Sequence, residues 1–454
     1  MILSYTFNMI ETAPVIEINI EPKILEKKHS TRFGRLLRIL GPGLITGAAD
    51  DDPSGIATYS QTGAQFGFGQ LWTALYQLPL IIAVQEACAR IGVVTGKGLA
   101  GVVKEHYSKR LLTAVVILVV IANTINIGAD IGAIASASQL VFDLPFALYA
   151  ILSAILVVAL EILISYKNYV KFLKFLTLSL LAYPVTALIV HEPWKQIFAA
   201  TLIPHMEFNF AFFFIVVGVF GTTITPYMFF WQASGEVEEE IANHHLAQKG
   251  GTPHGIKKFL KQVRLDTTIG MVAAEIAQWF IIITTATILF SHGITNITSA
   301  ADAAKALEPL VRSFPNSGQL AKDIFAVGII GLGLLAIPVL AASTAYAMSE
   351  AFGWREGLYR KFRKARGFYG VIIVATFIGL LMNFVGINPI KALVFAAVFN
   401  GVTAVPLLFL INRINANEAI LGKYKGGALS QTVIWITFAI MSFGALGLFY
   451  TLLA

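Results

Sequence analysis

The chain has 454 residues, of which 56% are hydrophobic and 13% charged, and its mean hydropathy is +0.73. This composition is too apolar for a soluble globular protein and is typical of a chain that crosses a membrane many times. The net charge is +7, but 27 of the 33 Lys and Arg lie in alternate connections between apolar runs, a distribution that indicates membrane topology rather than nucleic-acid binding.

Apolar runs of roughly 20 residues, enough to cross a hydrocarbon core of about 30 Å, recur along the whole chain. The sequence lacks the short alternating segments of a β-barrel, so it predicts an all-α polytopic membrane protein. We expect eleven spans, centred near residues 52, 82, 122, 154, 180, 221, 280, 335, 377, 401 and 441.

The segments before and between these spans predict the orientation of the chain. Residues 1–35 carry acidic and basic side chains without a cleavable signal pattern, and we expect them to form a polar cytoplasmic tail. The basic connections then also lie in the cytoplasm, and eleven spans put Ala454 on the outside. The predicted location is a plasma membrane or a bacterial inner membrane.

The first span is interrupted in its middle. Its apolar run from Leu36 to Ala49 stops at the sequence DDDPSG and resumes from Ile56 to about Phe66. Pro53 lacks an N–H donor and clashes with the preceding turn, so carbonyls and amides around it lose their helical partners. In lipid, such backbone has to line a cavity or be buried in protein.

The sixth span repeats this interruption at GTTITPY, residues 221–227, where Pro226 follows several hydroxyl-bearing residues. Each break opens a group of five spans, and a repeat of five spans must enter the membrane inverted in its second copy. This pattern predicts a 5+5 inverted-repeat transporter fold, in which broken helices build a site near the midplane. The predicted divisions are the tail at 1–35, the first repeat at 36–190, the second repeat at 208–412, and an added eleventh helix at 428–454.

Each break also has a purely structural interpretation. Asp-Pro-Ser-Gly is an ordinary helix start with Asp52 as N-cap, and TTITPY can be a proline kink whose carbonyls bind Thr hydroxyls. However, an ionised carboxylate at mid-membrane costs roughly 2.5–3.5 kcal/mol, so we favour a functional role for Asp52. Asp50 and Asp51 either face an aqueous vestibule or pair within the bundle.

These motifs resemble those of the NRAMP family of divalent metal ion transporters. The family's first break, Asp-Pro-Gly-Asn followed by Phe-Ala-Thr-Asn-Ile-Gln, matches DPSGIATYSQ at five positions: Asp52, Pro53, Ala57, Thr58 and Gln61. The second span, VQEACARIGVVTGKGLA, continues the likeness with Gln85 and Thr95-Gly96-Lys97. The family's Ala-x-x-Met-Pro-His motif aligns with TTITPY, and the resemblance extends from about Gly41 to the tenth span. It implies the same inverted-repeat fold.

The resemblance implies a metal site with two departures from the family pattern. Asp52 and the Thr222 carbonyl remain as ligands, but Gly55 replaces the family's asparagine and Thr225 replaces its methionine. A thioether favours softer transition metals, whereas carboxylate, carbonyl, hydroxyl and water ligands favour Mg²⁺, Ca²⁺ or Mn²⁺. Two shorter side chains leave room for the water that Mg²⁺ retains. We expect a hard, partly hydrated cargo, as in the NRAMP-related magnesium transporters.

Proton coupling is the second departure. In the third helix the family carries two acids three residues apart, whereas TINIGADIGA has Ile127 and Asp130 at these positions. Tyr227 and Gln232 stand where the family has histidines after the sixth-helix break. Neither titrates near neutral pH, so neither replaces an imidazole as a proton relay. Protons are therefore a doubtful partner, and a proton-coupled Mn²⁺ or Fe²⁺ symporter that uses Asp130 is the alternative.

Further polar residues lie within the spans. Asn400 matches the family's tenth-helix glutamine approximately, and Glu86 and Glu275 either face the pathway or are structural acids, protonated or paired with Arg90. EVEEE at residues 236–240 is predicted to be a solvated helix end. The expected metal site comprises Asp51, Asp52, Gly55, Thr222, Thr225, Tyr227 and Asn400.

An intramembrane enzyme is the competing class of function. The eight histidines lie in the tail, the connections or the span ends, and none forms the His-x-x-x-His spacing of a helical zinc site. The single cysteine, Cys88, excludes a thiolate cluster. The sequence therefore predicts a transporter without catalytic residues or a bound cofactor, which has a divalent cation as substrate and the lipid bilayer as its surroundings.

Overall fold

The two predicted breaks interrupt helices in the structure at the expected positions. The computed structural model describes residues 42–164, 181–190, 192–242, 245–246, 249–251, 253 and 255–453. The first span consists of α2 (Pro42–Asp50) and α3 (Pro53–Phe66), and the sixth of α11 (Phe210–Thr223) and α12 (Pro226–Ala242). Both second halves begin at the proline, whose missing N–H costs the helix that it opens none of its own hydrogen bonds.

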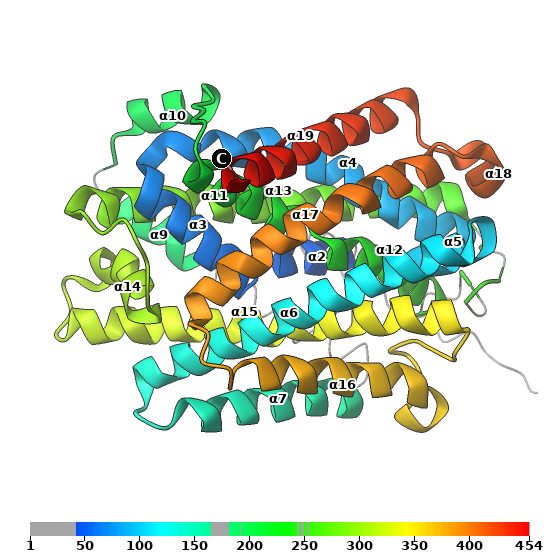
Figure 1. Cartoon of the computed structure of the whole chain (residues 1–454), viewed down its shortest axis with the longest axis horizontal. Coiled ribbons are helices and arrows are strands. Elements are labelled where there is room, and N and C mark those ends of the chain that lie inside the picture. The colour runs from blue at the N-terminus through cyan, green and yellow to red at the C-terminus, as the bar shows by residue number, and fades with distance from the viewer. Residues whose placement is uncertain are drawn as a thin grey trace, which may run out of the picture. The chain divides into compact units, whose positions relative to one another are not determined.

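Unbroken helices supply the other spans, and Figure 1 follows them in chain order. The described part of the first half adds α4 (Trp72–Thr95), α5 (Leu99–His106), α6 (Lys109–Val141), α7 (Phe146–Leu163), α9 (Ala182–Ile189) and α10 (Trp194–Leu202). The second half adds α13 (Ile256–Ile288), α14 (Ala300–Ala304), α15 (Ser317–Phe352), α16 (Arg366–Met382), α17 (Pro389–Asn415), α18 (Glu418–Leu421) and α19 (Ala428–Leu453). Short 3₁₀ turns, the first at Gly67–Gln70, connect several of them.

The described helices confirm an all-α membrane protein. Eight of them, with α11 and α12 counted together, are long and apolar enough to span a membrane, and α16 is a shorter apolar helix. The described residues contain no strand. The fifth predicted span is centred in residues 165–180, which lie outside the described residues, as does the predicted tail at 1–35.

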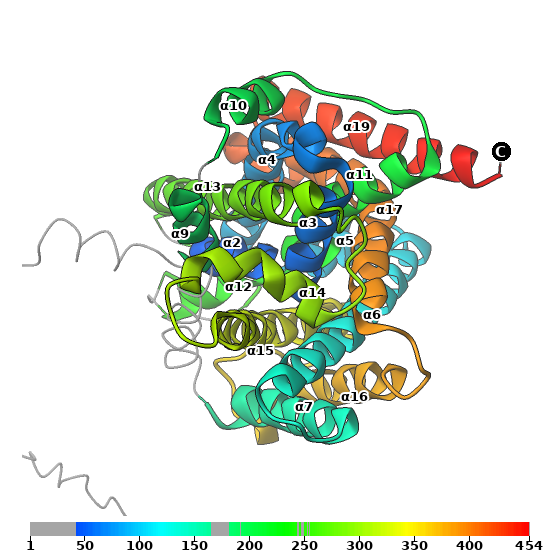
Figure 2. The same ribbon diagram turned by 90° about the vertical axis from the view of Figure 1, so that its left-hand side faces the viewer.

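The broken helices occupy the middle of the unit formed by Leu40–Ala454. The first twelve residues of α3, Pro53 to Ala64, are all buried, and 94% of the apolar window through α11 and α12 is buried. In contrast, α7 and α19 bury only 28% of theirs. Figures 1 and 2 both show α7 beside α16 at one edge, and α6 beside α15 closer to the centre.

Two glycine contacts hold the broken helices against their neighbours. A Cβ on Gly47 of α2 would lie 2.2 Å from the carbonyl oxygen of Gly270 on α13. A Cβ on Gly221 of α11 would lie 2.1 Å from the carbonyl oxygen of Ala397 and 2.3 Å from the amide nitrogen of Gly401, both on α17. Small residues allow this backbone approach, which membrane helices use for packing. The two breaks are therefore fixed against α13 and α17.

The expectation of a solvated helix end at residues 236–240 is wrong. Glu236, Glu238 and Glu240 are buried, each less than 4% exposed. Glu238 accepts hydrogen bonds from the Tyr346 hydroxyl at 2.6 Å and from the Leu358 N–H at 2.9 Å. The charge pattern of residues 236–240 is typical of a surface helix. The end of α15 and the following loop cover this segment and supply hydrogen-bond donors that the sequence alone does not reveal.

Candidate metal site

Asp52 caps the second half of the first broken helix. Its Oδ1 accepts hydrogen bonds from the Ser54 hydroxyl at 2.6 Å and from the Gly55 N–H at 2.7 Å. This is N-cap geometry, in which a carboxylate satisfies free amides at the positive end of a helix. The structural interpretation of Asp-Pro-Ser-Gly as a helix start is therefore correct, but it accounts for only one of the two carboxylate oxygens.

The other oxygen of Asp52 points to the third span. Asn126 on α6 donates its side-chain N–H to Oδ2 of Asp52 at 3.0 Å. The amide of Asn400 on α17 lies 3.5 Å from the Asn126 side-chain oxygen, at the limit of a hydrogen bond. A polar chain thus runs from the first break through α6 to the predicted residue Asn400.

The second break faces the first across a short distance. The Thr222 hydroxyl lies 3.2 Å from the Ser54 hydroxyl. The α-helical donor for the Thr222 carbonyl would be the N–H of residue 226, which is proline and has none. The Thr222 carbonyl is consequently left without its helical donor, at the residue whose hydroxyl contacts Ser54 of the Asp52 cap.

The same rule frees a carbonyl at the first break, where Pro53 deprives Ala49 of its helical donor. That carbonyl accepts a hydrogen bond of 2.5 Å from the Tyr227 hydroxyl in the first turn of α12. Tyr227, which stands at a histidine position of the family pattern, therefore joins the two breaks by satisfying one of the two proline-freed carbonyls.

Gly55 and Thr225 differ in how the structure places them. A Cβ on Gly55 would lie 3.4 Å from the Thr222 hydroxyl oxygen and 3.0 Å from the Asp50 carbonyl oxygen, so a side chain here would fill the space between the breaks. Thr225 is fully buried, and its hydroxyl has no hydrogen-bond partner among the described residues. The hydroxyl of Thr225 is therefore available to a further partner.

Asp50 and Asp51 precede the Asp52 cap, and the role of Asp51 as a metal ligand stays a prediction. Both are buried, and neither oxygen of Asp51 has a hydrogen-bond partner in the described part of the chain. They interact electrostatically with each other, with Asp52 and with Glu275 on α13. No group of three or more His, Cys, Asp or Glu side chains among the described residues could hold a metal ion.

Two other acids have separate surroundings. Glu86 accepts from Arg90 at 2.7 Å and from Arg264 at 2.6 Å, which is the paired structural role left open for it. Asp130 on α6 is fully buried, and neither of its oxygens has a hydrogen-bond partner among the described residues.

Two residues of this site are not predicted from the sequence. The sequence predicts Ser54 only as part of the break, but its hydroxyl links Asp52 to Thr222. Asn126 lies one helical turn before Asp130, on the same face of a hydrophobic span. A polar residue four positions before an intramembrane acid, as Asn126 is before Asp130, is the sequence signal that could have identified it.

The site is closed to solvent. Asp52, Thr222 and Asn400 are each 1% exposed, and Thr225 is 0% exposed. It contains one carboxylate, one carbonyl without a helical donor, and several hydroxyl and amide groups. Oxygen donors of this kind suit a hard cation better than a soft one.

Comparison with known proteins determines the family. Residues 43–451 match the family model described as natural resistance-associated macrophage protein-like, or Nramp. The chain belongs to the Nramp family. It is 24% identical to a protein of Ralstonia nicotianae named divalent metal cation transporter MntH, over 98% of each chain. It is 25% identical to the MntH of Klebsiella pneumoniae, over 91% of this chain and 95% of that one.

Solved structures confirm the fold of this Nramp member. A manganese transporter of Eremococcus coleocola, crystallised with an aromatic bis-isothiourea compound, superposes with a TM-score of 0.71 at 18% identity, covering 92% of this chain and 87% of that one. The structure of MhsT in complex with L-phenylalanine superposes with a TM-score of 0.58 at 12% identity, covering 90% of this chain and 98% of that one. The predicted inverted-repeat transporter fold with broken first and sixth helices and an eleventh helix is thus correct.

Proposed function

We propose that this chain is a secondary transporter that moves divalent metal cations across a membrane by alternating access. The observation that carries the proposal is the position of Asp52, which caps one broken helix and is linked through the Ser54 hydroxyl to Thr222 at the break of the other. Relatives that match nearly the full length of the chain are named divalent metal cation transporters, which agrees with this role. In transporters of this architecture, unwound carbonyls and helix ends coordinate the transported ion.

The proposed ligands are the Asp52 carboxylate, the Thr222 carbonyl and the Thr225 hydroxyl. Asn400 and Asn126 orient the carboxylate, and Tyr227 fixes the distance between the breaks through the Ala49 carbonyl. Asp51 is a further proposed ligand, because both of its carboxylate oxygens are buried and have no hydrogen-bond partner among the described residues.

We further propose a preference for hard ions such as Mg²⁺ and Mn²⁺. The ligand set contains oxygen alone, because Thr225 supplies a hydroxyl where a thioether would favour softer metals. Gly55 leaves the space between the breaks free of a side chain, so coordinated water can remain on the ion. Mg²⁺ sheds water reluctantly and is commonly held through one or two carboxylates and several waters.

The proposed membrane topology is consistent with alternating access. The repeats comprise residues 36–190 and 208–412, followed by a helix at 428–454, and the amino terminus lies in the cytoplasm of a plasma membrane or bacterial inner membrane. The two breaks then belong to inverted copies of one unit. A closed site between such copies is accessible to either side in turn when one copy moves against the other.

A proton-coupled Mn²⁺ or Fe²⁺ symporter is the second candidate. Asp130 favours it, because this carboxyl is buried without a hydrogen-bond partner among the described residues and interacts electrostatically with Asp52. A cation arriving at Asp52 would lower the proton affinity of such a group.

The first prediction concerns the charge of Asp52. Asparagine is as good an N-cap as aspartate, so Asp52→Asn keeps the start of α3 while removing the charge. We expect Mg²⁺ and Mn²⁺ uptake into proteoliposomes to fall about tenfold or more, with an unchanged thermal unfolding midpoint. Asp143→Asn, in the exposed α6–α7 connection, is the matched control. Uptake retained in Asp52→Asn would show that the ion binds elsewhere.

The second prediction concerns the missing thioether. Thr225→Met adds a soft ligand at the break, and we expect Cd²⁺ to become a stronger competitor of Mn²⁺ uptake. Thr225→Leu has a similar size without sulfur and separates the effect of the donor atom from that of volume. If both variants give the same competition profile, position 225 does not contact the ion.

The third prediction separates the two candidates. A pH-sensitive dye inside the same liposomes reports proton movement while metal uptake is measured under an imposed pH gradient. The main proposal predicts metal uptake without internal acidification and without acceleration by an inward proton gradient. Acidification that accompanies uptake in the native protein and is lost in Asp130→Asn would establish the symporter instead.

A further inference from the structure

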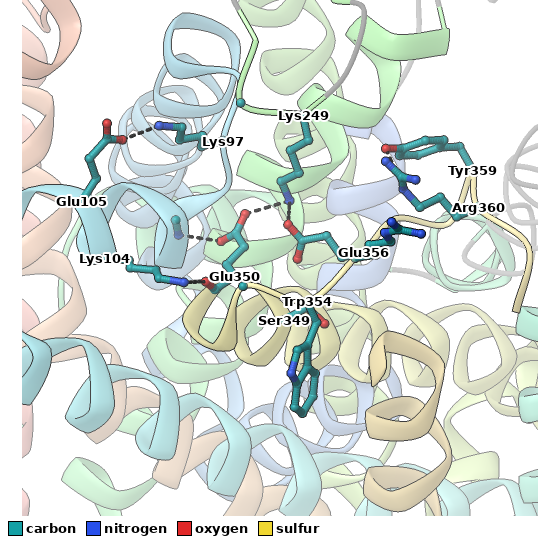
Figure 3. Close-up of a pocket in the computed structure, with 14 residues that line it drawn as sticks. Lys97, Lys104, Glu105, Lys249, Ser349, Glu350, Trp354, Glu356, Tyr359 and Arg360 are labelled. Carbon is teal, nitrogen blue, oxygen red and sulfur yellow. Dashed lines mark hydrogen bonds and ion pairs between the residues drawn. The ribbon is translucent and has the colours of Figure 1, made fainter. Parts of the chain in front are cut away.

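A charged pocket lies far along the chain from the residues of the metal site. It is a cavity of about 560 Å³, lined by residues 97–105, 249–250 and 349–360 of the described chain. Figure 3 shows its side chains, which come from the α4–α5 region, the segment before α13, and the carboxyl end of α15 with the loop that follows. All of these segments belong to connections rich in Lys and Arg.

Cations outnumber carboxylates in this charged pocket by five to three. The cations are Lys97, Lys104, Lys249, Arg355 and Arg360, and the carboxylates are Glu105, Glu350 and Glu356. All three carboxylates are already paired, because Lys249 binds Glu350 at 2.7 Å and Glu356 at 2.9 Å, while Lys97 binds Glu105. The pocket therefore has an excess of positive charge.

Three of the five cations have no carboxylate partner in the described part of the chain. Among the described residues, no carboxylate oxygen lies within 4 Å of the charged nitrogens of Lys104, Arg355 or Arg360. Lys104 donates to the backbone carbonyl of Glu350 at 3.1 Å, and the Arg360 guanidinium lies 4.9 Å from the Tyr359 ring centre. These contacts position the two side chains but leave their charges unneutralised, so the charged pocket can attract an anion.

An apolar pocket of about 380 Å³ lies between α6, α15 and α16. Its lining is almost entirely hydrocarbon and includes Val120, Met348, Val374 and Ile378. Its α16 residues extend from Gly367 to Ile378, which corresponds to about 16 Å along a helix. At Gly370 an added Cβ would meet nothing within 4 Å, so the apolar pocket is open at that position.

Trp354 lines both pockets. In Figure 3 its indole points away from the Lys249 and Glu350 side chains. The ring packs on Gly367, where a Cβ would lie 2.7 Å from it, and stacks on Phe352 with ring centres 4.9 Å apart. Trp354 is 43% exposed, and tryptophan in such a position is characteristic of the boundary between hydrocarbon and headgroups.

We propose that the two pockets form one binding site for an anionic phospholipid. The phosphate lies beside Arg355 and Arg360 in the charged pocket, and an acyl chain occupies the apolar pocket along α16. Basic pockets between membrane helices recognise anionic headgroups, and the adjoining apolar pocket explains why a lipid fits better than a soluble anion. The site does not depend on which ion the protein transports.

Native mass spectrometry of the purified full-length protein tests this proposal. The protein is titrated with phosphatidylglycerol and with phosphatidylcholine of the same acyl chains. We expect one phosphatidylglycerol to bind at least tenfold more tightly than phosphatidylcholine. The double variant Arg355→Gln, Arg360→Gln should lose this preference, because each cation contributes about fivefold to the affinity for an anionic headgroup. Arg363→Gln, Lys364→Gln removes the same charge from the same loop outside the pocket and should retain it.

A second variant tests the apolar pocket independently of charge. Gly370→Leu places a side chain in the apolar pocket at a position where a Cβ meets nothing within 4 Å, and we expect phosphatidylglycerol binding to fall about tenfold. Gly328→Leu, a helical glycine on α15 that also has open space beside it, is the matched control. Equal binding of the two lipids, or equal effects of the two leucine variants, would overturn the proposal. So would displacement of the lipid by millimolar inorganic phosphate, because the site would then recognise a free anion.

Discussion

The missing N–H of two prolines is the constraint on which this structure depends. Pro53 and Pro226 each remove one helical hydrogen bond in the middle of a membrane span, and the carbonyls of Ala49 and Thr222 lose their donors. Within a bilayer these carbonyls cannot form hydrogen bonds with water, so another part of the protein or a ligand has to satisfy them. The Tyr227 hydroxyl satisfies Ala49, and we propose that the transported ion satisfies Thr222.

Contacts with neighbouring helices fix the positions of the two breaks and of Asp52. Glycine contacts fix α2 against α13 and α11 against α17, so the two breaks cannot drift apart without disturbing close backbone packing. Asp52 is oriented at one oxygen by its own helix and at the other by Asn126. A carboxylate held from both sides loses little further conformational freedom when it binds a cation, which benefits affinity.

The sequence predicted the features that follow from covalent structure. A proline frees the carbonyl four residues before it but does not by itself break a span, because Pro79, Pro338 and Pro406 lie inside the continuous helices α4, α15 and α17. The breaks, the Asp52 cap and the freed Thr222 carbonyl could be predicted because each proline coincides with neighbouring polar and glycine residues. Features that depend on which helices are neighbours in the fold could not be predicted from the sequence. The Asn126 contact to Asp52 and the burial of Glu238 beneath the α15–α16 loop arise between segments 74 and 120 residues apart. Asp50 and Asp51 still lack a structural explanation beyond their proximity to Glu275.

The position of the bound ion tests the central claim most directly. Crystals of the protein soaked with Mn²⁺ and measured at the manganese absorption edge would locate the ion by its anomalous scattering. We predict one peak between the two breaks, within ligand distance of the Asp52 carboxylate and the Thr222 carbonyl oxygen, with water in the remaining positions. A peak beside Asp50, Asp51 and Glu275, with none at Asp52, would contradict this account.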